Sequence, residues 1–240
     1  MPYYYYGFDW TYFVLVLPCM IFALIASANV NSTFKKYSTQ YSQRKLTGAE
    51  AAQRVLQHNG VTGVRIERVS GNLTDHYDPR TNVIRLSDSV YSSTSTAAIG
   101  VACHEAGHAV QYAKNYAPIK LRAAIIPLTN FGSRLAMPLI LAGILFTFLG
   151  EFSTVLVYLG IAAFGLSFVF QLVTLPVEFN ASRRAMQAIE DANLLSWEEQ
   201  RGAKKTLQAA AMTYVAATAT ALAQLLRLIL IYGRRNRRSN

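Results

Sequence analysis

Charged residues are scarce in this chain of 240 residues, and cysteines are scarcer still. Charged side chains make up 15% of the sequence and hydrophobic ones 52%, whereas an average soluble domain has roughly 25% charged residues. The two cysteines, Cys19 and Cys103, cannot supply the four thiolates of a cysteine-type zinc site. A disulfide framework is not expected either, because both cysteines lie in apolar or helical surroundings.

Acidic residues are also few, 13 against 23 basic ones, which gives a formal net charge of +10. The basic residues flank long apolar blocks, as Lys and Arg do in membrane proteins. No interleaving of basic and aromatic residues indicates a surface that reads nucleic acid. We therefore expect the lipid bilayer as a partner and no nucleic acid.

Four apolar blocks lie along the chain, at about residues 10–30, 125–150, 152–175 and 207–232. The first has no charged residue and is long enough to cross ~30 Å of hydrocarbon as a helix. The second begins with polar interruptions, so we expect an interfacial lead-in and a crossing from about Leu135. The third should form a tight hairpin with the second and end at Pro176.

The first and last blocks each allow an alternative. Ala26-Ser27-Ala28 resembles a signal-peptide cleavage site, but no positive residue precedes the first block, which favours an uncleaved anchor. The last block contains Gln208, Gln224 and Arg227. It is either a fourth crossing, which its length favours, or a re-entrant or interfacial segment.

The polar region 31–122 predicts a small helix–strand–strand–helix unit. Thr47 and Glu50 form a capping-box pattern that opens a helix, and Gly60 is expected to stop it. Residues 61–69 alternate apolar and polar side chains, which is typical of a strand. The turn at residues 78–82 precedes a second strand at residues 83–87, and a further helix runs from about Ser95 to Tyr112.

The sequence His104-Glu105-Ala106-Gly107-His108 carries the strongest chemical signal. On a helix, His104 and His108 share a face, so both imidazoles can bind one zinc ion. Glu105 then lies beside the ion, where it can take a proton from a water that the metal acidifies. Chance would give such a motif roughly once in 500 such chains. The alternative is a pair of core histidines beside a satisfied glutamate.

Catalytic zinc usually has three protein ligands, and Glu178 is the best candidate for the third. Two predicted crossings separate it from His108, so the chain returns to the same side of the membrane. His58 and His76 are single histidines of the kind that is usually solvated. The alternative for Glu178 is an interfacial glutamate that favours the N-terminal dipole of a helix.

The sequence resembles the YugP-type membrane neutral zinc metallopeptidases and, more distantly, the HtpX and Ste24 gluzincin proteases. The motif at residues 104–111 and the segment Leu175-Pro176-Val177-Glu178-Phe179-Asn180-Ala181-Ser182-Arg183-Arg184-Ala185 carry the resemblance. It implies Zn²⁺ as the cofactor, His104, His108 and Glu178 as its ligands and Glu105 as the catalytic base. The distant relatives have an aspartate that orients a metal-bound histidine where this chain has Ser182. Because serine is neutral and shorter, the resemblance leaves this role open, with Asn180 as a residue that could share it.

The resemblance and the blocks together give the expected architecture. It is a mainly α integral membrane protein with about four transmembrane helices and a small α/β zincin-like catalytic unit. The expected parts are an anchor (1–30), a cytoplasmic zincin-like unit (31–122), a transmembrane hairpin (123–176), a helical region with the third ligand (177–205), and a C-terminal transmembrane or interfacial helix with a basic tail (206–240).

These features predict a zinc-dependent endopeptidase that acts on peptides or membrane proteins. In zincins an edge strand pairs with the substrate, and residues 83–86 are the candidate, with a packed inner strand as the alternative. The oxyanion stabiliser is open, with Arg183 and Arg184 near in sequence. A non-catalytic zinc-binding membrane scaffold is the alternative function, and Glu105 distinguishes the two because a structural site needs no base.

The distribution of basic residues predicts which side of the membrane the site faces. Lys and Arg are concentrated on the metal-bearing side of the first three blocks, and such residues mark the cytoplasmic side. We therefore expect a multi-pass protein of the plasma membrane with the zinc site facing the cytoplasm. The tail, with Arg234, Arg235, Arg237 and Arg238, conflicts with this rule if the last block crosses fully.

Overall fold

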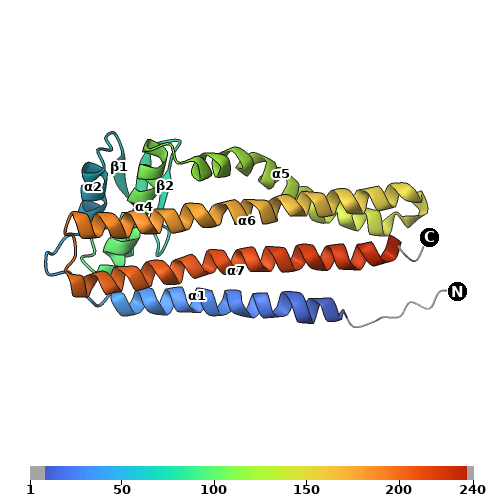
Figure 1. The fold of residues 1–240 in the computed structure, drawn as a ribbon, viewed down its shortest axis with the longest axis horizontal. Coiled ribbons are helices and arrows are strands. Elements are labelled where there is room, and N and C mark those ends of the chain that lie inside the picture. The colour runs from blue at the N-terminus through green and yellow to red at the C-terminus, as the bar shows by residue number, and fades with distance from the viewer. Residues whose placement is uncertain (1–8, 237–240) are drawn as a thin grey trace. The chain divides into compact units, whose positions relative to one another are not determined.

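A computed structural model describes residues 9–236 (Figure 1). Of residues 149 and 233–236 it describes the backbone alone. Four of its helical stretches are long and apolar enough to cross a membrane. They are α1 (Leu17–Tyr37, continuing the π-helical turn η1, Tyr12–Val16), α5 (Ala117–Leu145), α6 (Glu151–Asp191) and α7 (Trp197–Asn236). The expected fold class, a mainly α membrane protein with a small α/β unit, is confirmed.

The chain divides into two compact units, and each is described by itself. The first comprises residues 1–25, 124–172 and 215–240 and holds most of the apolar helix length. Within it, the 3₁₀ turn η2 (Thr147–Leu149) and Gly150, with φ of +60°, connect α5 to α6 as the predicted hairpin. The two helices approach closely, since a Cβ on Gly160 would lie 2.7 Å from the Ala136 carbonyl oxygen.

Arg227, the one cation in the last apolar block, has a partner inside this first unit. Its Nη2 lies 2.6 Å from Asp9 Oδ2, and its guanidinium group lies 5.5 Å from the centre of the Tyr12 ring. Pairing reduces the cost of placing a charge in an apolar segment. In the described residues α7 is one unbroken helix, which favours a crossing over a re-entrant segment, since the latter needs a chain reversal.

The second unit comprises residues 26–123 and 173–214. It contains α2 (Gly48–His58), β1 (Arg65–Val69), β2 (His76–Asp78), β3 (Val83–Ser87), the short α3 (Asp88–Tyr91) and α4 (Thr96–Ala113). The capping box is confirmed: Thr47 accepts from the Glu50 amide, and Glu50 accepts from the Thr47 amide. Ser95 caps α4 by accepting from the Ala98 amide at 3.2 Å, and buried aliphatic side chains of α2, β3, α4 and α6 form the core.

The sheet has one strand more than the sequence predicted. The order is β1-β3-β2, with β1 parallel and β2 antiparallel to β3. β2 was missed because three residues are too few to show an alternating pattern. The candidate edge strand at residues 83–86 is wrong, since β3 is central and largely buried, and both of its edges are already paired.

Proline 176 does not interrupt its helix, contrary to the prediction. α6 continues through it to Asp191, although proline removes one helical donor. The carbonyl groups around it have side-chain donors from elsewhere: Gln111 Nε2 donates to the Val177 oxygen at 2.8 Å, and the Tyr116 hydroxyl reaches the Pro176 oxygen at 3.5 Å. These contacts fasten α6 to α4 and to the segment after it, whereas the carbonyl that the proline leaves without a helical donor is that of Leu172, four residues earlier.

Candidate metal centre

The predicted metal site lies where α4 packs against α6, inside the second unit. A Cβ on Gly107 would lie 2.7 Å from the Ala181 carbonyl oxygen, so only glycine allows the two backbones to approach this closely. One helical turn on α4 places His104 and His108 on the face that meets α6. The site therefore depends on a close contact between two helices that are far apart in the sequence.

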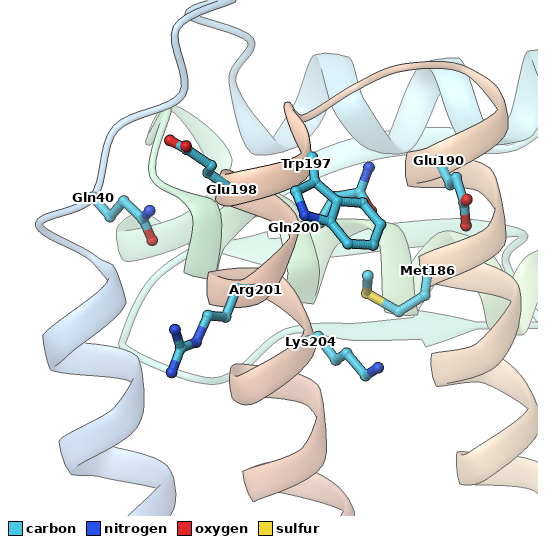
Figure 2. Close-up of a pocket in the computed structure, with 8 residues that line it drawn as sticks. All are labelled: Gln40, Met186, Glu190, Trp197, Glu198, Gln200, Arg201 and Lys204. Carbon is cyan, nitrogen blue, oxygen red and sulfur yellow. The ribbon is translucent and has the colours of Figure 1, made fainter.

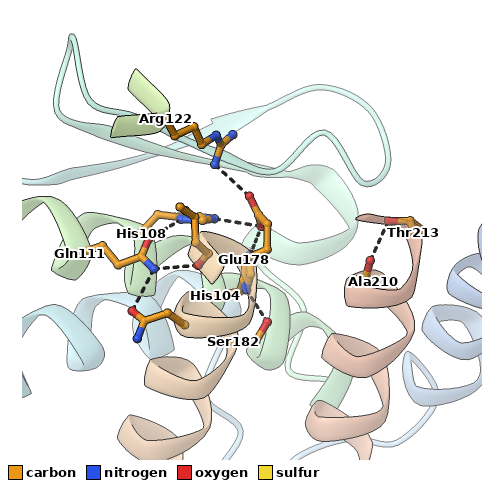
Figure 3. A network of polar contacts seen from close by, with 10 residues as sticks. His104, His108, Gln111, Arg122, Glu178, Ser182, Ala210 and Thr213 are labelled. Carbon is orange, nitrogen blue, oxygen red and sulfur yellow. Dashed lines mark hydrogen bonds and ion pairs between the residues drawn. The ribbon is translucent and has the colours of Figure 1, made fainter. Parts of the chain in front are cut away.

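The three predicted ligands meet at this contact (Figure 3). Oε2 of Glu178 lies 3.2 Å from His104 Nε2 and 3.4 Å from His108 Nε2. One ligand atom from each residue lies within 4.8 Å of the others. All three side chains are largely shielded from solvent, and Glu178 is 2% exposed.

These separations suit a small divalent cation. A tetrahedral zinc site with bonds of about 2.0–2.2 Å places its ligand atoms roughly 3.4 Å apart, close to the two measured distances. Two imidazole nitrogens and one carboxylate oxygen are also the donor set of many catalytic zinc sites. The residues present therefore fit zinc.

Each imidazole also has a partner for its other ring nitrogen (Figure 3). Nδ1 of His104 lies 3.1 Å from Ser182 Oγ, and Nδ1 of His108 lies 3.0 Å from Gln111 Oε1. If Nε2 offers its lone pair to an ion, Nδ1 carries the proton and donates it to these oxygens. Ser182 is thus placed to orient His104 despite being neutral and short.

Asn180 contacts Gln111 instead of a histidine. Gln111 Nε2 donates to Asn180 Oδ1 at 3.0 Å, and Arg184 Nε donates to the same oxygen at 2.8 Å. Gln111 was not among the predicted site residues. It lies three residues after His108 and therefore on the same helical face. This spacing was the one signal in the sequence that could have indicated its contact with His108.

Arg122, at the beginning of α5, is a second residue that the sequence did not reveal. Its Nη1 lies 2.9 Å from Glu178 Oε1, the oxygen that faces away from the histidines. Arginine before an apolar block is usually a topology signal, so nothing in the sequence distinguished it. The ion pair fixes which carboxylate oxygen faces the imidazoles.

Glu105 faces a cavity of about 260 Å³ beside His104. The cavity is mostly apolar, and its lining comes from α1, α4, α7 and the loop before β2: Val30, Leu73, Asp75, Val101, His104, Glu105, Leu207, Ala210, Thr213 and Tyr214. Among the described residues, no hydrogen bond or ion pair engages the Glu105 carboxylate. This carboxylate is therefore available to a molecule that enters the cavity.

Burial and charge change the titration of two groups near the cavity. Burial raises the pKa of Asp75 above its ordinary value, even though the amide and hydroxyl of Ser87 donate to its carboxylate at 2.7 and 3.0 Å. Burial opposes protonation of His108, but the hydrogen bond and charge of Glu178, together with the charge of Glu105, raise its pKa. The carboxylates of Glu178 and Glu105 thus favour positive charge at His108, as they would favour a bound cation.

The remaining candidates lie elsewhere. The His58 ring is 3.7 Å from Asp191, and exposed His76 is bound to the Thr74 carbonyl oxygen. Cys103 is buried, and burial raises its thiol pKa. Neither arginine proposed for the oxyanion lines the cavity: Arg183 is exposed, whereas Arg184 is bound to Asn180.

Comparison with known families agrees with this class of site. The family described as "Putative neutral zinc metallopeptidase" matches residues 12–233, nearly the whole chain. The chain belongs to this family.

The chain is also similar to an individual protein of known sequence. The chain is 47% identical over 207 residues to the "Putative membrane protease YugP" of Bacillus subtilis (strain 168), a match that covers 86% of this chain and 90% of the relative. No solved structure matches the chain significantly.

Proposed function

We propose that this protein is a membrane-embedded zinc endopeptidase of the gluzincin type. His104, His108 and Glu178 hold the metal, and Glu105 is the catalytic base. The observation that carries the proposal is the convergence of the three ligand atoms beside a cavity into which Glu105 presents an unengaged carboxylate. A structural zinc site needs neither that cavity nor that carboxylate, which favours an enzyme over a zinc-binding scaffold.

The protein's own groups have distinct tasks in this reaction. A zinc ion in such a site supplies Lewis-acid chemistry, polarising a peptide carbonyl and lowering the pKa of water. Glu105 accepts a proton from the attacking water and passes it to the departing amine nitrogen. Ser182 and Gln111 hold the two imidazoles in orientation, and Arg122 holds Glu178.

Tyr214 is our candidate for stabilising the oxyanion. It lines the same cavity as His104 and Glu105, and its phenol is a hydroxyl donor there. The Tyr214 hydroxyl is hydrogen-bonded to Glu178, so it lies at the proposed metal ligands, whereas the Thr213 hydroxyl donates at 2.6 Å to the Ala210 carbonyl oxygen. Tyr214→Phe should keep zinc and lower kcat by about 100-fold or more, as loss of one oxyanion donor does.

The substrate backbone can pair with β2. This strand is at an edge of the sheet, and Leu73 and Asp75, just before it, line the cavity beside Glu105. An extended peptide on that edge would add a strand to the sheet and bring one peptide bond to the site. The apolar lining favours an apolar substrate side chain next to that bond.

We also propose that the site faces the cytoplasm and acts on peptides or membrane proteins at the membrane surface. The concentration of Lys and Arg on the metal-bearing side supports this orientation. Cysteine labelling tests it in intact cells: single cysteines at exposed positions such as Gln53 on α2 should react with a membrane-impermeant reagent only after lysis. Labelling before lysis would contradict it.

Glu105→Gln tests the proposed activity. The purified full-length protein in detergent should cleave an unfolded protein substrate, and the variant should lose at least about 100-fold in rate, the scale of general acid–base catalysis. Its zinc content should stay at the wild-type level. If the variant cleaves as fast as wild type, Glu105 is not the base; if wild-type protein with full zinc cleaves nothing, the scaffold function is favoured.

A further inference from the structure

A second cavity, away from the metal ligands, lies between α1 and α7 in the second unit. It has a volume of about 440 Å³. α1 contributes Asn29, Thr33, Lys36 and Tyr37, and α7 contributes Arg201, Lys205, Gln208, Ala209 and Met212. Spacings of three and four residues place each set on one helical face.

The charge in this cavity is entirely positive. Lys36, Arg201 and Lys205 line it, and no acidic residue does. Among residues 9–236, none of these three side chains forms an ion pair with a carboxylate, and Lys36 has only the Tyr37 ring, 5.6 Å away. Three cations around one hollow repel each other unless an anion joins them.

A neighbouring cavity shows the contrast. It measures about 880 Å³ and is lined on one side by the same Arg201 (Figure 2). There, Glu190 and Glu198 accompany Arg201 and Lys204, and the exposed Trp197 ring lies among them. Its charges compensate each other, so it has no comparable preference for an anion.

The lining of the positive cavity also changes in character along the helices. Its cations come from the polar end of α7 and the last turn of α1, both of which belong to candidate membrane spans. Farther along α7 the lining becomes Ala209 and the exposed Met212. From Arg201 to Met212 the helix rises about 16 Å, enough for a headgroup and the start of an acyl chain.

We propose that this cavity binds an anionic membrane phospholipid, with its phosphate held by Lys36, Arg201 and Lys205. Basic pockets between membrane helices are suited to such headgroups. Asn29, Thr33 and Gln208 offer further polar contacts to the headgroup, and the acyl chain follows Ala209 and Met212. The lipid joins α1 to α7, whose other faces carry Val30, Leu207 and Tyr214 of the cavity at Glu105.

The test compares two variants of equal charge. The first, Lys36→Gln/Arg201→Gln/Lys205→Gln, removes the cations of the cavity. The control, Lys114→Gln/Lys120→Gln/Arg183→Gln, removes three exposed cations outside it. Native mass spectrometry of full-length protein, released from detergent with added phosphatidylglycerol or phosphatidylcholine, measures retained lipid without requiring proteolysis.

Wild type and control should retain phosphatidylglycerol in preference to phosphatidylcholine. The cavity variant should bind it roughly 100-fold more weakly, the loss expected for three basic residues. Equal retention by the cavity variant and the control overturns the proposal, as does equal retention of both lipids by wild type. If inorganic phosphate displaces the lipid at equal concentration, the cavity is a free-anion site and the lipid assignment is wrong.

A loss of fold would be recognised in the same samples. All three substituted side chains are exposed, so the cavity variant should elute as wild type does on size exclusion. The single variant Lys205→Gln provides a milder change, with an expected loss of about fivefold. If this variant is folded and retains the lipid as wild type does, Lys205 does not hold the phosphate.

Discussion

At the scale of single residues, the metal centre depends on side chains that do not touch the ion. Ser182 and Gln111 contact the imidazoles, and Arg122 contacts the carboxylate. Gln111 connects the most groups, since it also donates to the Val177 oxygen and to Asn180. It links the orientation of His108 to the backbone of the helix that carries Glu178.

Replacing Gln111 should therefore weaken zinc binding without removing a ligand. In Gln111→Ala, His108 loses its partner and the Val177 carbonyl loses a donor, so zinc affinity should fall by about 10–100-fold. Competition with a chromophoric chelator measures this. Gln53→Ala, on the exposed face of α2, is the control. Unchanged affinity in Gln111→Ala would mean that other contacts orient His108.

Arg122 leads to a prediction that depends on the metal. The Glu178 side chain is 3% exposed, and its partner Arg122 is 29% exposed. Without metal, Arg122→Gln removes a charged hydrogen bond from a buried carboxylate and should cost about 1.5–3 kcal/mol. With zinc bound, the ion compensates the same carboxylate, so the loss should be smaller.

Thermal unfolding in detergent, with excess chelator or with excess zinc, tests this dependence. The decrease in Tm caused by Arg122→Gln should be larger in chelator. Arg183→Gln, an exposed position on the same helix as Glu178, should change Tm little in either condition. Equal decreases in both conditions would show that Arg122 stabilises the fold independently of the site.

At the scale of secondary-structure elements, the contact between α4 and α6 decides whether the ligands meet. Gly107 allows it, because any side chain there would collide with the Ala181 backbone. α6 is also continuous through Pro176, so Glu178 and Ser182 are held one turn apart on a single helix. The histidine pair on α4 faces this second pair of residues across the contact.

Gly107→Ala should consequently separate the helices and disturb the site. Overpacking of this kind typically costs about 1–3 kcal/mol, and zinc content after purification should fall. Gly165→Ala on α6 is a matched control, because its added Cβ meets no atom within 4 Å. Metal analysis and Tm of the two variants provide the comparison. Full zinc content in Gly107→Ala would show that the helices tolerate the separation.

At the scale of the whole molecule, the sequence predicts the spans better than the site. The four apolar blocks, the hairpin connection at Gly150 and the capping box of α2 follow from local patterns, and the structure confirms them. Counting crossings also predicted that Glu178 returns to the side of His104 and His108, and the structure brings the three side chains together. Their role as zinc ligands stays a prediction.

What the sequence could not reveal depends on tertiary contacts. β2 exists because β3 pairs with it, and its three residues have no pattern of their own. The helix continues through Pro176, although proline usually interrupts a helix, and Gln111 and Tyr116 fasten it at this point through the Val177 and Pro176 oxygens. Arg122 pairs with Glu178 because the fold brings the beginning of α5 next to α6. In the sequence, an arginine just before an apolar block indicates only the topology of the membrane protein.

X-ray absorption at the zinc edge, on the purified full-length protein, tests the central claim most directly. The account predicts about one zinc per chain in a shell of nitrogen and oxygen ligands at about 2.0–2.2 Å, with the scattering signature of two imidazoles. Glu178→Ala should lose most of its zinc or change that shell. A sulfur ligand at about 2.3 Å, or the same shell and zinc content in Glu178→Ala, would contradict it.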